Sequence, residues 1–394
     1  MSTYPRAFVL ALAISLVGTM SNGLVTPILP VFVEDRLGGG DTLVGLVVAL
    51  APAFSLCGGL LAGPYIDGAG RRVTATAGLS IALIGALILI VADSVAITVL
   101  ARSVFGVGAG ITAAATITWA VDQVPPDRRG RALSVFGLTV WIGLSAGPQV
   151  GQALFDAAGF VAVWVAIAVL EGGGLVLALL GREPRERPPE GPPARRKLVP
   201  LGAGRPAVLI AMAAYGEGVI MAFLVLHLIE RGVPEGAGVG GAASVYTIFA
   251  ASVLVLRVVG GALVDRYRPE MVASAAFAAE ALGLVAIAVA SSFSVAALGA
   301  AAMGAGFAVL FPSLAVVATH NAADEERGAA LAAFGSAFGA GLTAGALLGG
   351  AIASVGGTGL AHLSGALAAG AAGTFLLVAG GTRRPHVALV ERAP

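Results

Sequence analysis

Charged residues are scarce in this chain. They make up 11% of its 394 residues, whereas hydrophobic residues make up 58%, and the mean hydropathy is +0.94. A soluble protein of this length would have too few polar residues to cover its surface. The composition therefore excludes an ordinary soluble domain and predicts an integral membrane protein.

Cysteine is almost absent as well. The single cysteine, Cys57, excludes an intramolecular disulfide and a cysteine-rich metal site. The sequence offers no nucleophile paired with a base, no metal-ligand cluster and no phosphate-binding loop, so we expect no enzyme and no cofactor. A GxGxG run at 106–110 lies inside an apolar stretch and lacks the preceding strand of a dinucleotide site. Cations are spread over predicted turns, so we expect no nucleic-acid partner.

Long apolar runs are abundant instead. Each has about 20 residues or more, enough to cross roughly 30 Å of hydrocarbon as a helix. The first is too long for a cleaved signal sequence, so we expect it to be retained. Together they predict an all-α membrane protein with twelve spans, at 8–33, 43–65, 73–92, 95–121, 132–155, 160–180, 207–229, 240–264, 271–290, 295–319, 329–355 and 360–379.

The chain repeats itself at an offset of 198 residues, as nine matching positions show. This predicts two similar six-helix halves, 1–181 and 207–381, with a cytoplasmic Pro- and Arg-rich linker at 182–206 and a tail at 382–394. Many transporters place their substrate site between such halves. The matching pairs are Gly63 and Gly261, Asp67 and Asp265, Gly106 and Gly304, Gly108 and Gly306, Arg129 and Arg327, Gly130 and Gly328, Gly143 and Gly341, Gly147 and Gly345, and Gly151 and Gly349.

The basic residues predict the orientation. Of 23 cations, 19 lie in the tails and loops that share one side of the twelve spans. Short loops rich in arginine and lysine stay in the cytoplasm, so we expect both termini there. Arginine greatly outnumbers lysine, and alanine and glycine are abundant, as in GC-rich bacterial genomes. We therefore expect a bacterial inner-membrane protein.

The turn after the second span carries the first recognisable motif. It reads Gly63, Pro64, Tyr65, Ile66, Asp67, Gly68, Ala69, Gly70, Arg71, Arg72. This resembles the GxxxDxxGRR loop between the second and third helices of the major facilitator superfamily, although that family usually has a basic residue at the place of Gly68. The resemblance extends over all twelve spans. It implies a transporter that works by alternating access, generally as a monomer.

In that family the loop is thought to act as a cytoplasmic latch. The resemblance implies that Asp67 is the latch acid, with Arg128, Arg129 or Arg131 as its partner. The partial second copy contains Asp265 and Arg266. Gly63 would allow a neighbouring helix to approach, and Gly70 would permit a tight turn. The alternative is a generic turn whose arginines only set the topology.

Two further motifs lie inside spans. Arg102 precedes Gly106, Gly108 and Gly110 in the fourth span, similar to an RxxxGxG pattern that the family links to proton transfer. The repeat copy has Ala300 in place of the arginine. An arginine at that depth is costly unless it faces water or a partner, although it could instead extend to the outer interface.

The fifth span resembles the GxxxGPxxGG motif of the family's proton-coupled drug antiporters. Gly143, Gly147, Pro148 and Gly151 match, whereas Gln152 replaces the last glycine. The glycines form a smooth helix face, and the proline removes a backbone hydrogen bond and bends the helix. Such stripes are common in membrane helices, so it is the proline that favours antiport.

Acids inside spans are candidates for function. In the superfamily the first, fourth, seventh and tenth helices line the cavity, so Glu217 in the seventh span is the first choice for a group that exchanges a proton. A structural hydrogen bond is its alternative role. Glu171 and Glu280 lie on peripheral spans, so we expect them to turn inward or pair. The candidate set for proton coupling and the substrate cavity is Glu217, Arg102, Arg257, Asn22 and Asp122.

The remaining cavity wall is expected to be apolar and aromatic, with Trp119, Trp141 and Phe223 if these face inward. His227, near the outer end of the seventh span, is expected at the membrane interface. The sequence thus favours an exporter of a small lipophilic compound in exchange for protons. A carrier of a sugar or other polar metabolite, and a sensor or scaffold of the same fold that does not transport, remain as alternatives.

Overall fold

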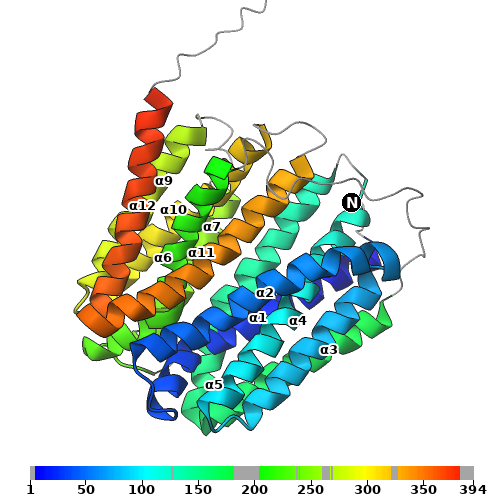
Figure 1. Cartoon of the computed structure of the whole chain (residues 1–394), viewed down its shortest axis with the longest axis horizontal. Helices are drawn as coiled ribbons and strands as arrows, with labels where there is room; N and C mark the ends of the chain where they lie inside the picture. Colours follow the sequence, from blue (N-terminus) through cyan, green and yellow to red (C-terminus); the bar gives the residue numbers. More distant parts are fainter. Residues whose placement is uncertain are drawn as a thin grey trace, which may run out of the picture.

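The computed structural model describes residues 5–125, 128–181, 204–236, 238, 240–259, 267, 269–320 and 327–381. Asp265, Arg266, most of the predicted linker and the 382–394 tail lie outside these residues. All regular structure in the described residues is helical (Figure 1). The helices are α1 (Arg6–Asp35), α2 (Asp41–Ala69), α3 (Arg71–Ile90), α4 (Val95–Asp122), α5 (Arg129–Leu180), α6 (Gly204–Glu230), α7 (Ala242–Val259), α9 (Pro269–Ala288), α10 (Phe293–His320), α11 (Arg327–Gly356) and α12 (Thr358–Gly381).

Helix α5 contains two of the predicted spans. It runs over 52 residues, but Gly159 inside it has φ 74° and ψ −169°. A positive φ is readily adopted only by glycine, so the chain changes direction there and α5 consists of two arms. Ten helices in the described chain are long and apolar enough to cross a membrane, and α7 is a shorter apolar helix. With the two arms of α5 counted separately, the helices correspond to the twelve predicted spans.

The repeated glycines occupy equivalent packing positions in the two halves. Gly106 and Gly108 of α4 lie directly on the backbones of α2 and α3. Their offset mates on α10, Gly304 and Gly306, lie on α7 and α9. Helix backbones approach this closely only where side chains are absent. The repeat seen in the sequence is therefore a repeat of helix contacts.

The glycine stripe of the fifth span faces α1. A methyl group at Gly147 would lie 2.5 Å from the Cα atom of Gly23, and one at Gly151 would lie 2.9 Å from the Cα atom of Leu24. In the second half, Gly345 of α11 packs in the same way on the α6 backbone. The predicted smooth helix face is thus a tight backbone contact within each half.

The two halves meet through α2 with α11 and through α5 with α7. We call the end of the bundle that holds Arg6 and Gly381 the terminal end, and the other the distal end. The Gln149 amide nitrogen donates to the Ser244 hydroxyl at 3.0 Å, and its oxygen accepts from the Gly238 N–H at 3.0 Å. These bonds join α5 to the second half near the distal end.

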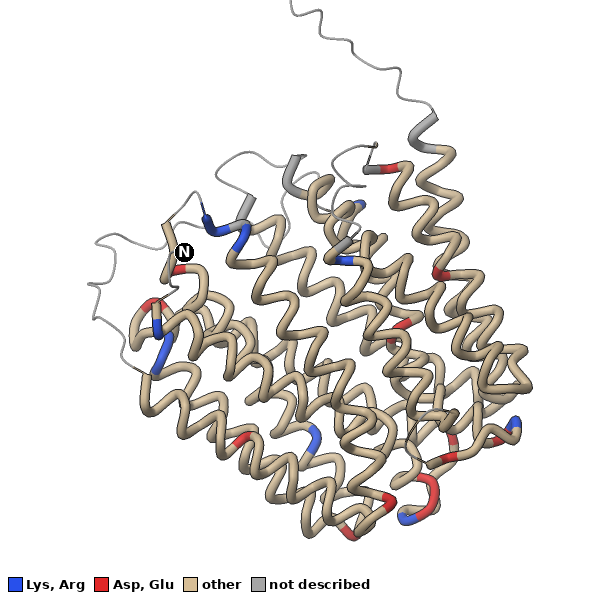
Figure 2. Tube along the Cα trace, turned by 180° about the vertical axis from the view of Figure 1, so that it is seen from behind, with Lys and Arg blue, Asp and Glu red and all other residues tan. Residues whose placement is uncertain are grey.

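Charged residues differ between the two ends of the bundle. In Figure 2, acidic segments gather along the lower edge, which is the distal end, with few basic segments among them. The upper, terminal end carries several basic segments. This distribution matches the arginine asymmetry on which the predicted orientation depends.

Candidate functional site

Glu217 lies on α6 in the interior of the second half. Its side chain is 3% exposed, and its Oε2 atom has no hydrogen-bond partner among the described residues. Three other polar groups interact with it electrostatically: Arg257 and Tyr246 of α7, and Glu280 of α9. An unpartnered carboxyl oxygen at such a depth is costly, so it is a candidate to bind a proton or a ligand donor.

Glu280 turns inward, as the sequence predicted for an acid on a peripheral span. It is fully buried, and Oε1 lies 3.0 Å from the position that a Cβ atom on Gly216 would take. Neither of its carboxyl oxygens has a hydrogen-bond partner in the described part of the chain. The glycine at 216 leaves room for this carboxyl against α6. The sequence did not reveal that Glu280 and Glu217 belong to one cluster.

Arg257 extends from α7 toward the first half. Its guanidinium carbon lies 5.5 Å from the ring centre of Trp141 on α5 and 5.7 Å from that of Phe311 on α10. A terminal nitrogen lies 3.3 Å from the Cβ position of Gly137 on α5. The two ring contacts have the geometry that is typical of cation–π interactions. Arg257 therefore connects the buried acid of one half to the aromatic surface of the other.

An aromatic cluster surrounds this contact. Trp141 packs edge to face against Phe249 and Phe307, with ring centres 6.0 and 5.9 Å apart, and Phe338 continues the cluster through Phe307 and Phe311. The sequence singled out Trp141 but missed Phe249, Phe307 and Phe338. In helices that are apolar on every side, no periodic signal distinguishes these phenylalanines from residues that face lipid.

The other two aromatic residues of the expected wall lie elsewhere. Trp119 is fully buried and packs against Gly181, in the apolar cluster of Phe8 and Phe136. Phe223 is also fully buried, next to Gly349. Both therefore pack within the halves rather than with Trp141.

The polar candidates of the first half pack within that half. Arg102 is 4% exposed, 5.6 Å from the ring centre of Phe105, so it is buried in the bundle and does not extend to the interface. Its Nε atom has no hydrogen-bond partner in the residues described. Glu171, also buried, is hydrogen-bonded to Ser21 of α1. Asn22 donates to the Gly18 carbonyl of its own helix at 3.1 Å.

Asp122 lies apart from the Glu217 cluster, at the end of α4. It forms an ion pair with Arg71, with Nη2 and Oδ2 2.7 Å apart, and both side chains are about a quarter exposed. Arg72 donates to the carbonyls of Ala178 and Leu179, at 3.1 and 2.6 Å. The two arginines of the loop thus tie the start of α3 to α4 and to the end of α5. The sequence had placed Asp122 with the cavity residues.

The described acid of the candidate latch and one of its candidate partners are at the surface. Asp67 is exposed near the end of α2, and Arg129 is exposed at the start of α5. Gly70 has φ 95° and joins α2 to α3, as expected for a tight turn. No described atom beyond its own turn of helix lies within 4 Å of the Cβ position of Gly63, so the close helix approach expected there is not seen.

Known proteins resemble the chain in sequence and in fold. A family model described as Major Facilitator Superfamily matches residues 11–228 and 206–393. The uncharacterized MFS-type transporter YhhS of Escherichia coli K12 is 27% identical over 321 residues, which cover 79% of this chain and 77% of that protein. An MFS-type transporter of Burkholderia mallei SAVP1 is 30% identical over 324 residues, with the same coverage.

Two solved structures share the arrangement of helices. The nucleoside transporter NupG has a TM-score of 0.77 at 14% identity and covers 95% of this chain and 98% of its own. A peptide transporter POT has a TM-score of 0.81 at 15% identity, with coverages of 96% and 94%. At such identities the likeness establishes the fold alone. Together with the family match over both halves, it shows that this chain belongs to the major facilitator superfamily, whose members are transporters and not enzymes.

Proposed function

We propose that this transporter exports small lipophilic compounds in exchange for protons. The observation that carries the proposal is the buried Glu217 carboxyl, whose Oε2 atom has no hydrogen-bond partner among the described residues and which interacts electrostatically with Arg257 at the junction of the halves. A carboxyl that is dry in one state and hydrated in the other can take up a proton and release it again. Alternating access of the two halves would supply those two states.

The aromatic cluster supports a lipophilic substrate. Trp141 and its phenylalanine neighbours supply large apolar faces, and Arg257, which interacts electrostatically with Glu217, is held against the rings of Trp141 and Phe311. Apolar and aromatic surface with a few polar groups is typical of sites for lipophilic ligands. The glycine and proline stripe of α5 supports antiport by its resemblance to the antiporter motif.

A polar solute is the second candidate. Besides Glu217, the Tyr246 hydroxyl and the Arg257 Nε atom are buried without hydrogen-bond partners among the described residues. Such groups can hold the donors and acceptors of a polar molecule. The proteins of similar fold include a nucleoside transporter and a peptide transporter. This candidate predicts transport that amphiphiles do not stimulate.

Substrate-dependent proton flux in proteoliposomes loaded with a pH dye separates the two candidates. We would test lipophilic cations, neutral amphiphiles, sugars, nucleosides and dipeptides on the wild type and on Glu217→Gln. Glu270→Gln is the matched control, because it makes the same chemical change in the first turn of α9. Amphiphile-driven flux that Glu217→Gln abolishes and Glu270→Gln retains is the expected result. Transport of a polar solute alone, or normal coupling in Glu217→Gln, would contradict the proposal.

The latch and the orientation complete the proposed mechanism. Asp67, exposed near the terminal end, is available to an arginine of its own half such as Arg129, which is also exposed there. The arginines of that end favour a cytoplasmic location for both termini, in the inner membrane of a bacterium. Reporter fusions after Arg6 and after Pro394 would test the orientation. We propose that the transporter acts as a monomer, which its mass in detergent would test.

A further inference from the structure

A chain of hydrogen bonds near the distal end of the second half joins Glu230 to His227. The Thr358 hydroxyl oxygen lies 2.7 Å from Oε2 of Glu230 and 2.9 Å from Nδ1 of His227. Nε2 of His227 lies 3.1 Å from the Ile287 carbonyl oxygen. The sequence predicted an interfacial histidine, but His227 is 1% exposed, enclosed by α6, α9 and α12.

The hydrogen-bond pattern allows two proton arrangements. The Ile287 carbonyl only accepts, so Nε2 of His227 must carry a proton. If the Thr358 hydroxyl donates to Glu230, Nδ1 must donate to Thr358, and the pair is an imidazolium with a carboxylate. If the hydroxyl instead donates to Nδ1, Glu230 carries the proton and the imidazole is neutral. To pass from the first arrangement to the second, the Nδ1 proton moves to the Thr358 oxygen while the hydroxyl proton moves to Glu230. No other bond changes.

A second buried histidine lies directly beyond this chain. The rings of His227 and His362 have their centres 4.9 Å apart. Nδ1 of His362 lies 2.8 Å from the Thr358 carbonyl oxygen, which fixes that nitrogen as a donor. Its Nε2 atom is fully buried, without a hydrogen-bond partner in the described chain. This nitrogen is free to receive a proton.

The series continues toward the centre of the bundle. Glu280 lies on α9 seven residues before Ile287, about 10 Å along the helix axis, and it is coupled to Glu217. Both oxygens of Glu280 are unpartnered among the described residues. Proton-binding groups therefore extend from the distal end to the central acid, all within the second half.

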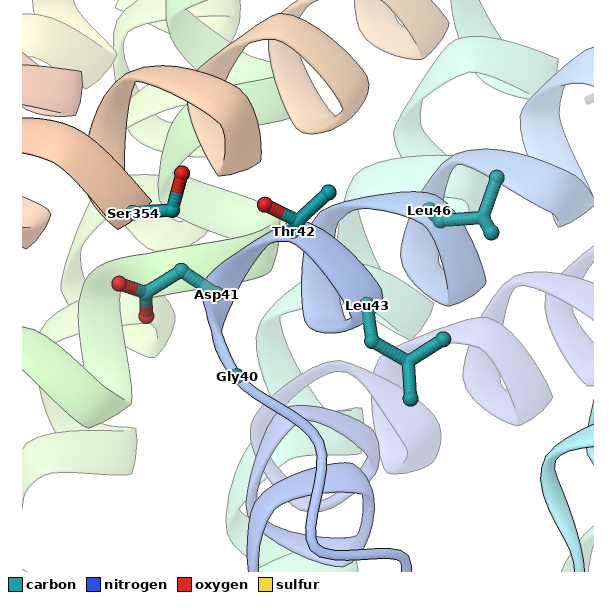
Figure 3. A pocket seen from close by; sticks show the side chains of 6 residues that line it. All are labelled: Gly40, Asp41, Thr42, Leu43, Leu46 and Ser354. Atoms are coloured by element: carbon teal, nitrogen blue, oxygen red, sulfur yellow. The ribbon is translucent and has the colours of Figure 1, made fainter.

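The distal entrance of the series is acidic. Glu34 and Asp41 of the first half interact electrostatically with Glu230, and the basic Arg231 follows it directly. Asp41 lines a pocket of about 330 Å³ between the start of α2 and the end of α11, where Ser354 lies opposite (Figure 3). Negative charge around an opening raises the local concentration of cations. The acids around Glu230 thus favour the arrival of protons at this end of the series.

We propose that Glu230, Thr358 and His227 form a proton relay that carries protons from the distal face toward His362, Glu280 and Glu217. It gives the proton-coupled exchange proposed above its entry route, and so depends on that function. Thr358 is a positioning and relay residue, because its hydroxyl is the link through which both protons move. The relay requires the hydroxyl and not the bulk of that side chain.

Thr358→Val and Thr358→Ser separate these requirements. Substrate-driven proton flux should fall by roughly tenfold or more in Thr358→Val and remain near the wild-type rate in Thr358→Ser. Substrate counterflow, which needs no net proton movement, should remain in both variants. Equal proton flux in the wild type and Thr358→Val would overturn the relay. Equal losses in the valine and serine variants would overturn it as well, because the hydroxyl would then not be the cause.

A measurement without transport distinguishes failure of the relay from failure of the proposed function. Nitrogen-15 spectra of histidine-labelled protein report whether each ring carries one proton or two, and His227→Asn assigns the signal. A doubly protonated fraction of His227 in the wild type that is lost in Glu230→Gln is the expected result. Identical His227 spectra in the two proteins would overturn the relay. Retained coupling in the spectra without proton-linked transport would overturn only the proposed exchange.

Discussion

The contact between α5 and α1 makes a sharp prediction for Gly147→Ala. The new methyl group would lie 2.5 Å from the Cα atom and 2.7 Å from the carbonyl carbon of Gly23. Nonbonded carbon atoms prefer about 3.5–4.0 Å, so the two helices must separate locally by about 1 Å. Both atoms belong to the helix backbone, which cannot rotate away as a side chain would.

The expected cost is that of overpacking. Inserting a methyl group into a tightly packed contact destabilises a protein by about 1–3 kcal/mol. The same substitution at Gly173 of α5 is the control, because no described atom beyond its own turn of helix lies within 4 Å of its Cβ position. At Gly173 alanine should be neutral or stabilising by up to about 1 kcal/mol, since it favours the helix more than glycine does. Only the substitution at Gly147 is therefore expected to destabilise the protein.

Thermal unfolding in detergent, followed by size-exclusion chromatography of the heated protein, tests this difference. Gly147→Ala should lower the midpoint by a few degrees, on the order expected for 1–3 kcal/mol in a chain of this size. Gly173→Ala should leave the midpoint unchanged or raise it. If Gly147→Ala melts with or above the wild type, the helices are not in the backbone contact described here, and the role of the stripe in packing is wrong.

Three smaller effects follow from other contacts. Asp122→Asn removes the ion pair with Arg71. Because both groups are partly exposed, the loss of stability should be below about 1 kcal/mol and should disappear at high salt. A larger loss, measured by chemical denaturation, would contradict this. Gln149→Leu removes hydrogen bonds between the halves near the distal end, whose net contribution is about 0.5–1.5 kcal/mol each. Distances between spin labels should therefore show a several-fold larger population that is open at the distal end. Unchanged distances would refute this. Burial and two nearby aspartates raise the pKa of Glu235, so the folded state holds its proton more tightly. This contribution to stability is present at low pH and is lost as the pH rises through that pKa. Above about pH 4.5 the melting temperature of Glu235→Gln should therefore fall less with rising pH than that of the wild type. Parallel dependences of the melting temperature on pH would refute this.

Much of the architecture could be read directly from the chain. Apolar runs of span length, the 198-residue repeat and the glycines at matched positions depend on local composition and spacing, which sequence shows directly. The division of α5 at Gly159 falls in the predicted gap between two spans. Glycine readily adopts the positive φ found there, which other residues rarely do. The importance of the 143–151 stripe for packing could also be predicted, since glycines four residues apart must lie on one helix face.

The grouping of polar residues could not be predicted in the same way. Glu280 and Glu217 lie on different helices, and only the rotation of α9 against α6 brings their carboxyls into one cluster. The same holds for His227 and Thr358, which are separated by 131 residues and meet through the packing of α6 with α12. Asp122 reads as an acid at a span end, yet its ion pair with Arg71 depends on how α3 lies against α4.

The physical reason is the solvent of the bilayer. In a soluble helix the polar face marks the surface and so indicates which side is buried. In a membrane helix both the lipid-facing side and the packed side are apolar. Sequence therefore determines that a helix spans and which glycines let it pack, and it predicts on which side of the membrane the loops lie. Which side chains then face one another is decided by tertiary packing alone, through backbone approach at glycines and the shape of neighbouring helices.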